Sequence, residues 1–157
     1  MNIKLRKADI MDCDMLFNWV NMKDSITNKL LTNKEILKSE HEKWFKLSLK
    51  NENRFIWIIL KNNISSGQIR FDLDKIKKLC FIDIYVDKSF REKNIGKTAL
   101  KLAMKLINKD KEIKYFIANV LVKNKSSIKF FKSLGFDYYE CKDDYIDFRL
   151  KLENFYA

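Results

Sequence analysis

Three short apolar segments, followed by an amphipathic helix and one more apolar segment, constrain this fold more than any other feature of the sequence. The three segments are separated by turns rich in Asn, Ser and charged residues, which favours antiparallel pairing. A helix over about 95–107 and a strand over 115–122 follow, and a strand–helix–strand crossover favours parallel pairing. The chain is therefore predicted to form a mixed α/β sheet. The three apolar segments are residues 55–60, 67–73 and 79–86.

Two helices are predicted before this centre, after a short strand over 2–6. Thr32-Asn33-Lys34-Glu35 has the spacing of a capping box and predicts a helix that runs to about Leu49. The first helix is predicted to bury Met11, Met15, Leu16, Trp19 and Val20. The second is predicted to bury Leu37, His41, Trp44, Phe45 and Ser48.

The C-terminal part is predicted to complete the same sheet. Asn124 is a suitable cap for a short helix, and Gly135 suits the left-handed position after it. Strands over 136–140 and 145–150 follow. The predicted order is β-α-α-β-β-β-α-β-α-β-β, in a single domain over residues 1–157 without linkers or repeats.

Charge and cysteine content narrow the class of protein. The net charge of +11 comes from 32 basic residues against 21 acidic ones, and the lysines lie in every segment rather than in one block. This distribution disfavours a noncatalytic nucleic-acid-binding module and is compatible with a local site for phosphates. Three separated cysteines and one histidine predict reduced thiols in a cytoplasmic protein with no metal site.

The segment from Ile84 to Lys97 carries the clearest chemical signal. A predicted buried strand ends at Val86, a basic loop follows, and a helix begins near Asn94. Free amides at a helix N-terminus attract anions, and Arg91 adds positive charge. Asn94 tolerates a left-handed backbone, while Gly96 would let the backbone approach a ligand. The segment therefore predicts a site for a pyrophosphate.

The same segment resembles the coenzyme A loop of the GNAT acetyltransferases, in which Arg or Gln precedes a Gly-x-Gly pattern. Here the loop is Arg91-Glu92-Lys93-Asn94-Ile95-Gly96-Lys97, with Asn94 in place of the first glycine. A later helix also resembles the family through Asn124, Ser127, Phe131, Gly135 and Phe136. The resemblance implies a GNAT-like fold and acetyl-CoA as co-substrate. It further implies that Ile84, Tyr85 and Val86 pair with the pantetheine arm, and that Asn124, Ser127 and Phe131 line its distal end.

The resemblance implies direct attack of an amine on the acetyl thioester, which needs a neutral amine, an oxyanion donor and a desolvated cleft. Asp83 is the one carboxylate in its apolar strand, and its predicted burial would raise its pKa. Alternatives are that Asp83 only pairs with a nearby Lys or Arg, that Asp72 is the base, or that a water chain serves. Many relatives have a tyrosine acid where this chain has Phe131. Either the thiolate leaves without an acid, or another hydroxyl serves, for which Tyr85, Tyr138 and Tyr139 are the candidates.

The acceptor is predicted from the N-terminal half. Segments around Trp19, His41 and Trp44, with Arg70 and Asp72, resemble the GNAT subgroup that acetylates the 4-amino group of nucleotide-linked amino sugars, as in the pseudaminic acid pathway. These residues are the expected acceptor contacts, although packing in the core is the alternative for His41 and Trp44. Other acceptors are a protein N-terminus, as in ribosomal-protein acetyltransferases, or a polyamine, which the positive charge disfavours. The oligomeric state is left open, a homodimer included.

Overall fold

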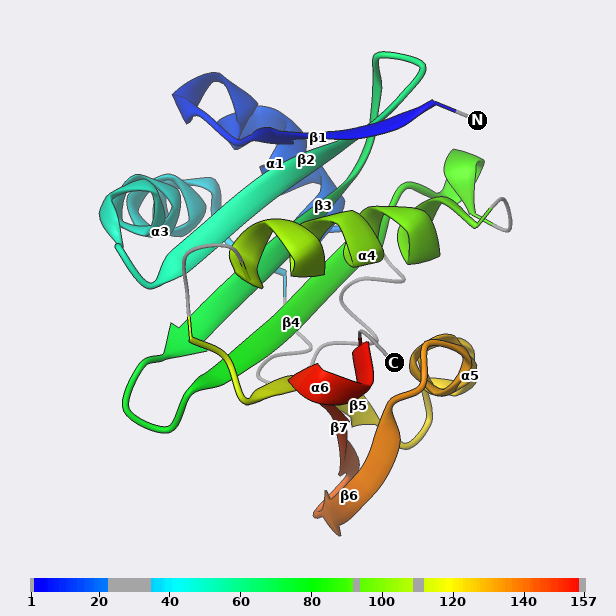
Figure 1. Cartoon of the computed structure of the whole chain (residues 1–157). Helices are drawn as coiled ribbons and strands as arrows, with labels where there is room; N and C mark the ends of the chain where they lie inside the picture. Colours follow the sequence, from blue (N-terminus) through cyan, green and yellow to red (C-terminus); the bar gives the residue numbers. More distant parts are fainter. Residues whose placement is uncertain (1, 23–34, 92–93, 109–111, 156–157) are drawn as a thin grey trace.

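A computed structural model of the chain describes residues 2–22, 35–91, 94–108 and 112–155. These residues form one seven-stranded sheet with the strand order β1-β2-β3-β4-β5-β7-β6 (Figure 1). The strands are β1 (Ile3–Lys7), β2 (Arg54–Lys61), β3 (Ile64–Asp74), β4 (Leu79–Val86), β5 (Tyr115–Leu121), β6 (Asp137–Lys142) and β7 (Tyr145–Lys151). The described helices are η1 (Ile10–Asp12), α1 (Cys13–Val20), α3 (Lys38–Lys50), η2 (Lys88–Phe90), α4 (Ile95–Asn108), α5 (Lys125–Ser133) and α6 (Leu152–Phe155).

The mixed sheet predicted from the sequence is confirmed. Neighbouring strands pair antiparallel, and the exception is the parallel pair β4–β5, which α4 connects. The predicted crossover therefore lies at the centre of the sheet.

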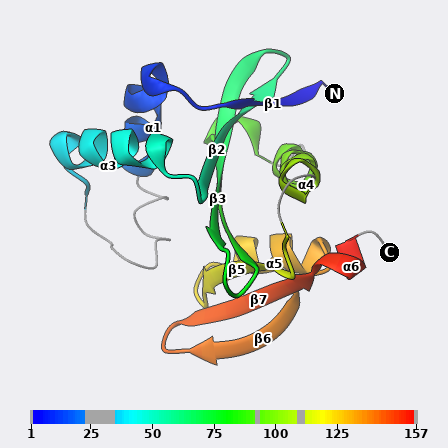
Figure 2. The ribbon, with the colours of Figure 1, turned by 60° about the vertical axis from the view of Figure 1, so that its left-hand side comes forward.

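The helices cover the sheet in two layers. Figure 2 shows α1 and α3 on one side of β1–β4 and α4 on the other. The α4 side contains the larger core, which extends from β2 to β7 and includes Phe71, Phe116 and Phe148. The α1–α3 side contains a smaller core around Trp19, Phe45 and other residues of α1, α3 and β2. The two cores are separated by the sheet itself.

Strand β4 follows the period of two that a strand imposes on its side chains. Its even-numbered residues, including Ile82 and Ile84, pack into the larger core with α4. Tyr85 packs on the opposite side, against the smaller core. Asp83, two residues before Tyr85, therefore lies on the same face as Tyr85.

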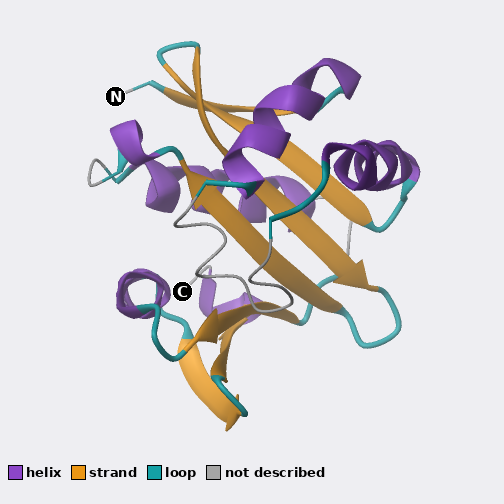
Figure 3. Cartoon of the chain, turned by 180° about the vertical axis from the view of Figure 1, so that it is seen from behind, coloured by secondary structure: helices purple, strands orange, loops and turns teal. Residues whose placement is uncertain are grey.

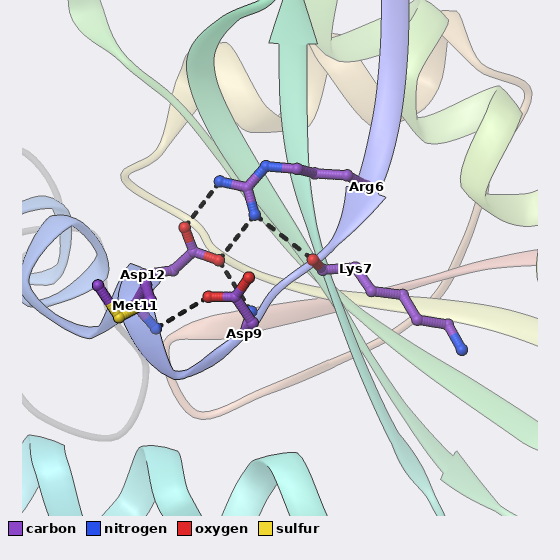
Figure 4. A network of polar contacts seen from close by, with 5 residues as sticks. All are labelled: Arg6, Lys7, Asp9, Met11 and Asp12. Atoms are coloured by element: carbon purple, nitrogen blue, oxygen red, sulfur yellow. Dashed lines mark hydrogen bonds and ion pairs between the residues drawn. The ribbon is translucent and has the colours of Figure 1, made fainter.

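An ion pair ties the end of β1 to the start of the first helical segment (Figure 4). The Arg6 guanidinium donates to both carboxylate oxygens of Asp12, with N···O distances of 2.7 and 2.8 Å. The Asp12 carboxylate also accepts from the Asp9 amide at 2.8 Å. These hydrogen bonds hold the pKa of Asp12 below, and that of Arg6 above, the ordinary values.

Several local predictions differ from the structure. Met11 is 86% exposed because it lies in η1, and the α-helical period begins only at Cys13. Leu37 is exposed because it is the N-cap of α3 rather than part of its buried face. The helix α6 was not predicted. Thr32, Asn33 and Lys34 of the expected capping box lie outside the described residues.

None of the described helices is long and apolar enough to cross a membrane. The described residues also contain no group of three or more His, Cys, Asp or Glu side chains that could hold a metal ion.

Candidate active site

The central feature of the site is a gap between β4 and β5. The two strands pair only from Leu79 with Tyr115 to Phe81 with Ile117, although both continue beyond. Over the rest of its length β4 still pairs with β3, and β5 still pairs with β7. Figure 1 shows β4 diverging from the β5–β7–β6 part of the sheet. We call the unpaired stretch, 82–86 facing 118–121, the strand gap.

Hydrogen bonds at the two ends of β4 show which backbone groups face the strand gap. The Lys114 amide donates to the Lys78 carbonyl at 2.7 Å, so Lys78 faces β5. The Asp87 amide donates to the Ser66 carbonyl at 2.8 Å, so Asp87 faces β3. Since these directions alternate along a strand, the N–H and C=O groups of Ile84 and Val86 point into the gap. An extended ligand could pair with them as a further strand does.

Tyr85 differs from its two neighbours in this respect. Its backbone faces β3, where a Cβ atom added to Gly67 would overlap the Tyr85 carbonyl oxygen. The prediction that Ile84, Tyr85 and Val86 all pair with a pantetheine arm is therefore wrong for the Tyr85 backbone. Strand alternation allows only every second residue to reach the gap.

The N-terminus of α4 lies next to the end of β4 in the sequence, as predicted. Asn94 has a φ of 58°, which confirms the left-handed backbone expected from an asparagine there. The first hydrogen bond of the helix runs from the Thr98 amide to the Asn94 carbonyl at 3.0 Å. The amides of Ile95, Gly96 and Lys97 therefore have no acceptor within the helix and can bind an anion. Glu92 and Lys93 lie outside the described residues.

Gly96 has a different role from the one expected. A Cβ atom at this position would lie 3.3 Å from both the Phe130 ring and a Val86 methyl group. The missing side chain therefore lets α4 pack closely against α5 and β4. The close approach that explains this glycine is to neighbouring side chains, whereas the sequence predicted an approach to a ligand.

Arg91 contacts the end of the strand gap directly. Its Nε donates to the Val86 carbonyl at 2.8 Å, and its guanidinium lies 5.3 Å from the centre of the Tyr85 ring. The Trp19 ring packs against the Tyr85 ring in a tilted arrangement, with 5.9 Å between the two ring centroids. Trp19 is buried and donates its indole N–H to Asp87, so it packs in the core instead of lining an open acceptor site.

The α5 residues of the predicted site shape the helix itself. Asn124 is its N-cap, as predicted, and its side-chain oxygen accepts from the Ser127 amide at 3.2 Å. Phe131 is buried in the larger core and lies edge-on to Phe136. Gly135 has a φ of 90°, which confirms the predicted left-handed C-terminal position.

Asp83 is exposed, and the side-chain amide of Gln68 donates to it at 2.9 Å. The prediction that this carboxylate is buried is wrong, because Asp83 lies on the face of β4 opposite α4, the face that Figure 3 shows from the front. The alternative was a pairing with Lys or Arg: Arg70 stands directly opposite Asp83 in the β3–β4 ladder, but its guanidinium binds Asp72, and the described residues show no ion pair to Asp83. Asp83 is placed on an open face beside the strand gap, where an acceptor amine could reach it.

Two arginines, one carboxylate and one indole form a cluster on the same face, which we call the arginine cluster. Asp72 accepts from Arg54 at 2.5 Å and from Arg70 at 3.2 Å. Both guanidinium groups lie 5.3 Å from the centre of the Trp44 ring. Asp72 is therefore committed to ion pairs and is a poor candidate for the base. The cluster keeps one positive charge in excess.

His41 does not belong to this open face. It is buried, its ring stacks on Phe45 at 6.1 Å, and its Nε2 lies 3.2 Å from the Cys13 carbonyl. The expectation that His41 contacts the acceptor is therefore wrong, and the packing alternative is confirmed.

The far side of the strand gap holds residues that the sequence analysis missed. Asn119 on β5 pairs across the ladder with Asp147 on β7. Asp147 is buried and binds the Arg149 guanidinium through both carboxylate oxygens, at 3.1 and 3.2 Å. This pairing raises the pKa of Arg149. A polar residue inside an apolar strand was the available signal, and it was applied to Asp83 but not to Asn119.

Several solved structures with the same fold are acetyltransferases. A spermidine N-acetyltransferase from Vibrio cholerae, in complex with CoA and spermine, has a TM-score of 0.87 and 11% identity over 99% of this chain and 98% of that one. A ribosomal-protein α-N-acetyltransferase in complex with CoA has 0.84 and 17%, over 98% and 96%. A microcin self-immunity acetyltransferase in complex with acetyl-CoA and AMP has 0.80 and 18%, over 96% and 92%.

Sequence comparison supplies the family. A search of curated proteins finds no match. The profile described as the acetyltransferase (GNAT) domain matches residues 2–137, which is most of the chain. This match agrees with the strand gap, the helix N-terminus beside it and the acetyl-CoA-using enzymes of the same fold. The chain belongs to the GNAT family of acetyltransferases.

Proposed function

We propose that this acetyltransferase transfers the acetyl group of acetyl-CoA to the 4-amino group of a nucleotide-linked amino sugar. The use of acetyl-CoA follows from the family. The sugar nucleotide is the proposal, and the arginine cluster carries it. Its excess positive charge lies on the acceptor face, on the strand next to Asp83, where it can bind a diphosphate. The half-buried Trp44 ring supports both guanidinium groups of the cluster on this face.

The charge of the acceptor separates this proposal from a polyamine substrate. A polyamine is a cation, and both the net charge of +11 and the arginine cluster would repel it. A nucleotide diphosphate carries the opposite sign. The microcin self-immunity acetyltransferase, which is solved with acetyl-CoA and AMP, supports the idea that this fold can bind a nucleotide together with acetyl-CoA.

In the proposed reaction the acceptor nitrogen attacks the thioester carbonyl carbon. A C–N bond forms, the C–S bond breaks, and the thiolate leaves. The proton lost by the nitrogen passes to Asp83, which is exposed on the acceptor face. Backbone N–H groups that point into the strand gap stabilise the carbonyl oxygen as it becomes negative. The Tyr85 hydroxyl is the proposed proton donor to the thiolate, because Phe131 has no hydroxyl to donate a proton.

The test measures free thiol released from acetyl-CoA with three acceptors: a UDP-linked 4-amino-4,6-dideoxy sugar, a peptide with a free N-terminus, and spermine. Turnover with the sugar nucleotide alone is expected. Turnover with the peptide alone would contradict the sugar proposal and favour a protein N-terminus, the acceptor of the ribosomal-protein relative.

A variant of Arg70 tests the role of the arginine cluster. Arg70→Met removes one guanidinium and keeps a chain of similar length against Trp44. It is expected to raise the KM for the sugar nucleotide about tenfold, the cost of losing one charge-assisted hydrogen bond, and to leave the KM for acetyl-CoA unchanged. An unchanged KM for the sugar nucleotide would contradict the assignment.

A further inference from the structure

We propose that the side-chain amide of Asn119 binds the amino group of the acceptor from the β5 side of the strand gap. This proposal rests on the acetyltransferase activity but not on the identity of the acceptor. Every primary-amine acceptor presents the same nitrogen to the thioester. Asn119 would therefore be an acceptor-binding residue that contacts the substrate opposite Asp83.

The first argument is the register of the sheet. Phe81 pairs with Ile117. If the pairing continued for two more residues along both strands, Asp83 would stand opposite Asn119. The strands separate before that level is reached. Asp83 and Asn119 are therefore the first residues on this face to stand on the two sides of the strand gap.

The second argument is the face on which the Asn119 side chain lies. The neighbouring residues Ala118 and Val120 belong to the larger core on the α4 side. Because side chains alternate along a strand, Asn119 points to the opposite face, which is the face of Asp83 and Tyr85. A nitrogen held between β4 and β5 on this face would therefore lie between Asp83 and Asn119.

The third argument is the hydrogen-bonding state of the amide. The Asn119 side-chain oxygen is buried and has no hydrogen-bond partner among the described residues. Leaving a buried polar atom unsatisfied costs about 1–3 kcal/mol of folding free energy. A leucine of similar size would avoid that cost. An acceptor N–H that binds this oxygen would explain why a polar residue is present.

The neighbouring ion pair does not satisfy Asn119, but it does hold this wall in place. Both oxygens of Asp147 are bound by Arg149, whose guanidinium also lies 3.8 Å from the Tyr139 ring centre. Asp147 and Arg149 together are neutral. Among the residues that the structure describes on the β5 side of the gap at this level, the Asn119 side-chain oxygen is therefore the hydrogen-bonding atom that has no donor.

The experiment compares Asn119→Leu and Asn119→Asp with the wild type. Leu keeps the size and removes the oxygen, whereas Asp keeps an oxygen that can accept an N–H. Asn119→Leu is expected to lower kcat/KM for the acceptor at least tenfold, to leave the dissociation constant of acetyl-CoA within twofold, and to raise the melting temperature. Asn119→Asp is expected to retain most of the activity.

Asn53→Leu is the matched control. Its side-chain oxygen is also buried without a partner, but it lies in the turn before β2, away from the strand gap. The control is expected to raise the melting temperature without changing kcat/KM. The assays use whichever of the three acceptors the wild type acetylates.

The outcomes are separable from those of the proposed function. If the wild type acetylates the peptide and not the sugar nucleotide, the sugar proposal fails, and Asn119 is tested on the peptide. If Asn119→Leu keeps the wild-type kcat/KM, or loses acetyl-CoA affinity, the Asn119 proposal is overturned. Should no acceptor be turned over, the melting temperature decides: a lower value for Asn119→Leu shows that the residue has a structural role and overturns the proposal.

Discussion

The two faces of the sheet differ in what they contain around the strand gap. On the α4 face, side chains from β2 to β7 form one continuous apolar core beneath α4 and α5. On the opposite face, α1 and α3 cover β1 and β2, and the middle strands carry Arg70, Asp83 and Asn119. The α4 face therefore holds the strands together across the gap, whereas the opposite face carries polar groups on both sides of it.

The largest effect is expected from breaking the apolar face. Phe148 on β7 is almost fully buried in the core beneath α4. Phe148→Ala removes most of a ring from a closely packed region and is expected to cost about 4 kcal/mol of unfolding free energy. Urea denaturation followed by circular dichroism measures it. Tyr138→Ala on the neighbouring β6 is the control, because Tyr138 is exposed and its loss should cost about 0.5 kcal/mol or less. Equal losses would contradict the contrast.

Breaking the Arg6–Asp12 pair tests whether a polar contact holds α1 in place on the α1–α3 face of the sheet. Arg6→Met leaves the buried Asp12 carboxylate without its partner and is expected to cost about 3 kcal/mol at neutral pH. Chemical denaturation of both proteins measures the difference. A loss below about 0.5 kcal/mol would place this pair with ordinary surface ion pairs.

The pH dependence of the unfolding free energy provides a second test of the Arg6–Asp12 pair. The pKa of Asp12 is lowered in the folded protein, chiefly by the Arg6 hydrogen bond. The stability that this provides is present above the unfolded pKa of about 4 and is lost as the pH falls through the lower folded value. The difference between wild type and Arg6→Met is therefore expected to shrink below about pH 4. A difference that stays constant down to pH 2 would contradict the role of the Asp12 charge.

Asp83→Asn separates chemistry from stability on the polar face. Because Asp83 is exposed, the variant is expected to keep the wild-type melting temperature. As the proposed base it is expected to lose about 100-fold in kcat, with the KM for acetyl-CoA unchanged. Stopped-flow thiol release measures the acetyl-transfer step. Full activity would favour the alternative in which a water chain accepts the proton.

The smallest effect is expected at Asn94, the residue immediately before α4. With a φ of 58°, Asn94→Ala is expected to cost about 1 kcal/mol, whereas Asn94→Gly is expected to be neutral or slightly stabilising. Thermal melts measure both. If the left-handed backbone aims the helix amides, acetyl-CoA affinity falls for Ala and not for Gly. The reverse order would contradict that link.

Periodicity explains why the apolar face could be predicted and the polar face only in part. Buried residues of α4 such as Ala99 and Ala103 recur every three or four positions, and burial requires that pattern. Asp83 was noticed as polar within an apolar strand, but its exposure depends on which helices cover β4, which is a tertiary property. His41 lies on a helical stripe whether it packs or catalyses. The gap beside Asn119 depends on where two distant strands separate.

The strand gap also has a kinetic consequence along a single strand. Amides of β4 that face β3 are hydrogen-bonded, whereas those of Ile84 and Val86 face a place where no strand pairs with them. Hydrogen exchange should therefore alternate between slow and fast from one residue to the next in the free protein. A ligand that fills the gap would slow the fast amides and leave the others unchanged. One strand of this protein is thus a ready-made reporter of occupancy, readable residue by residue without any label.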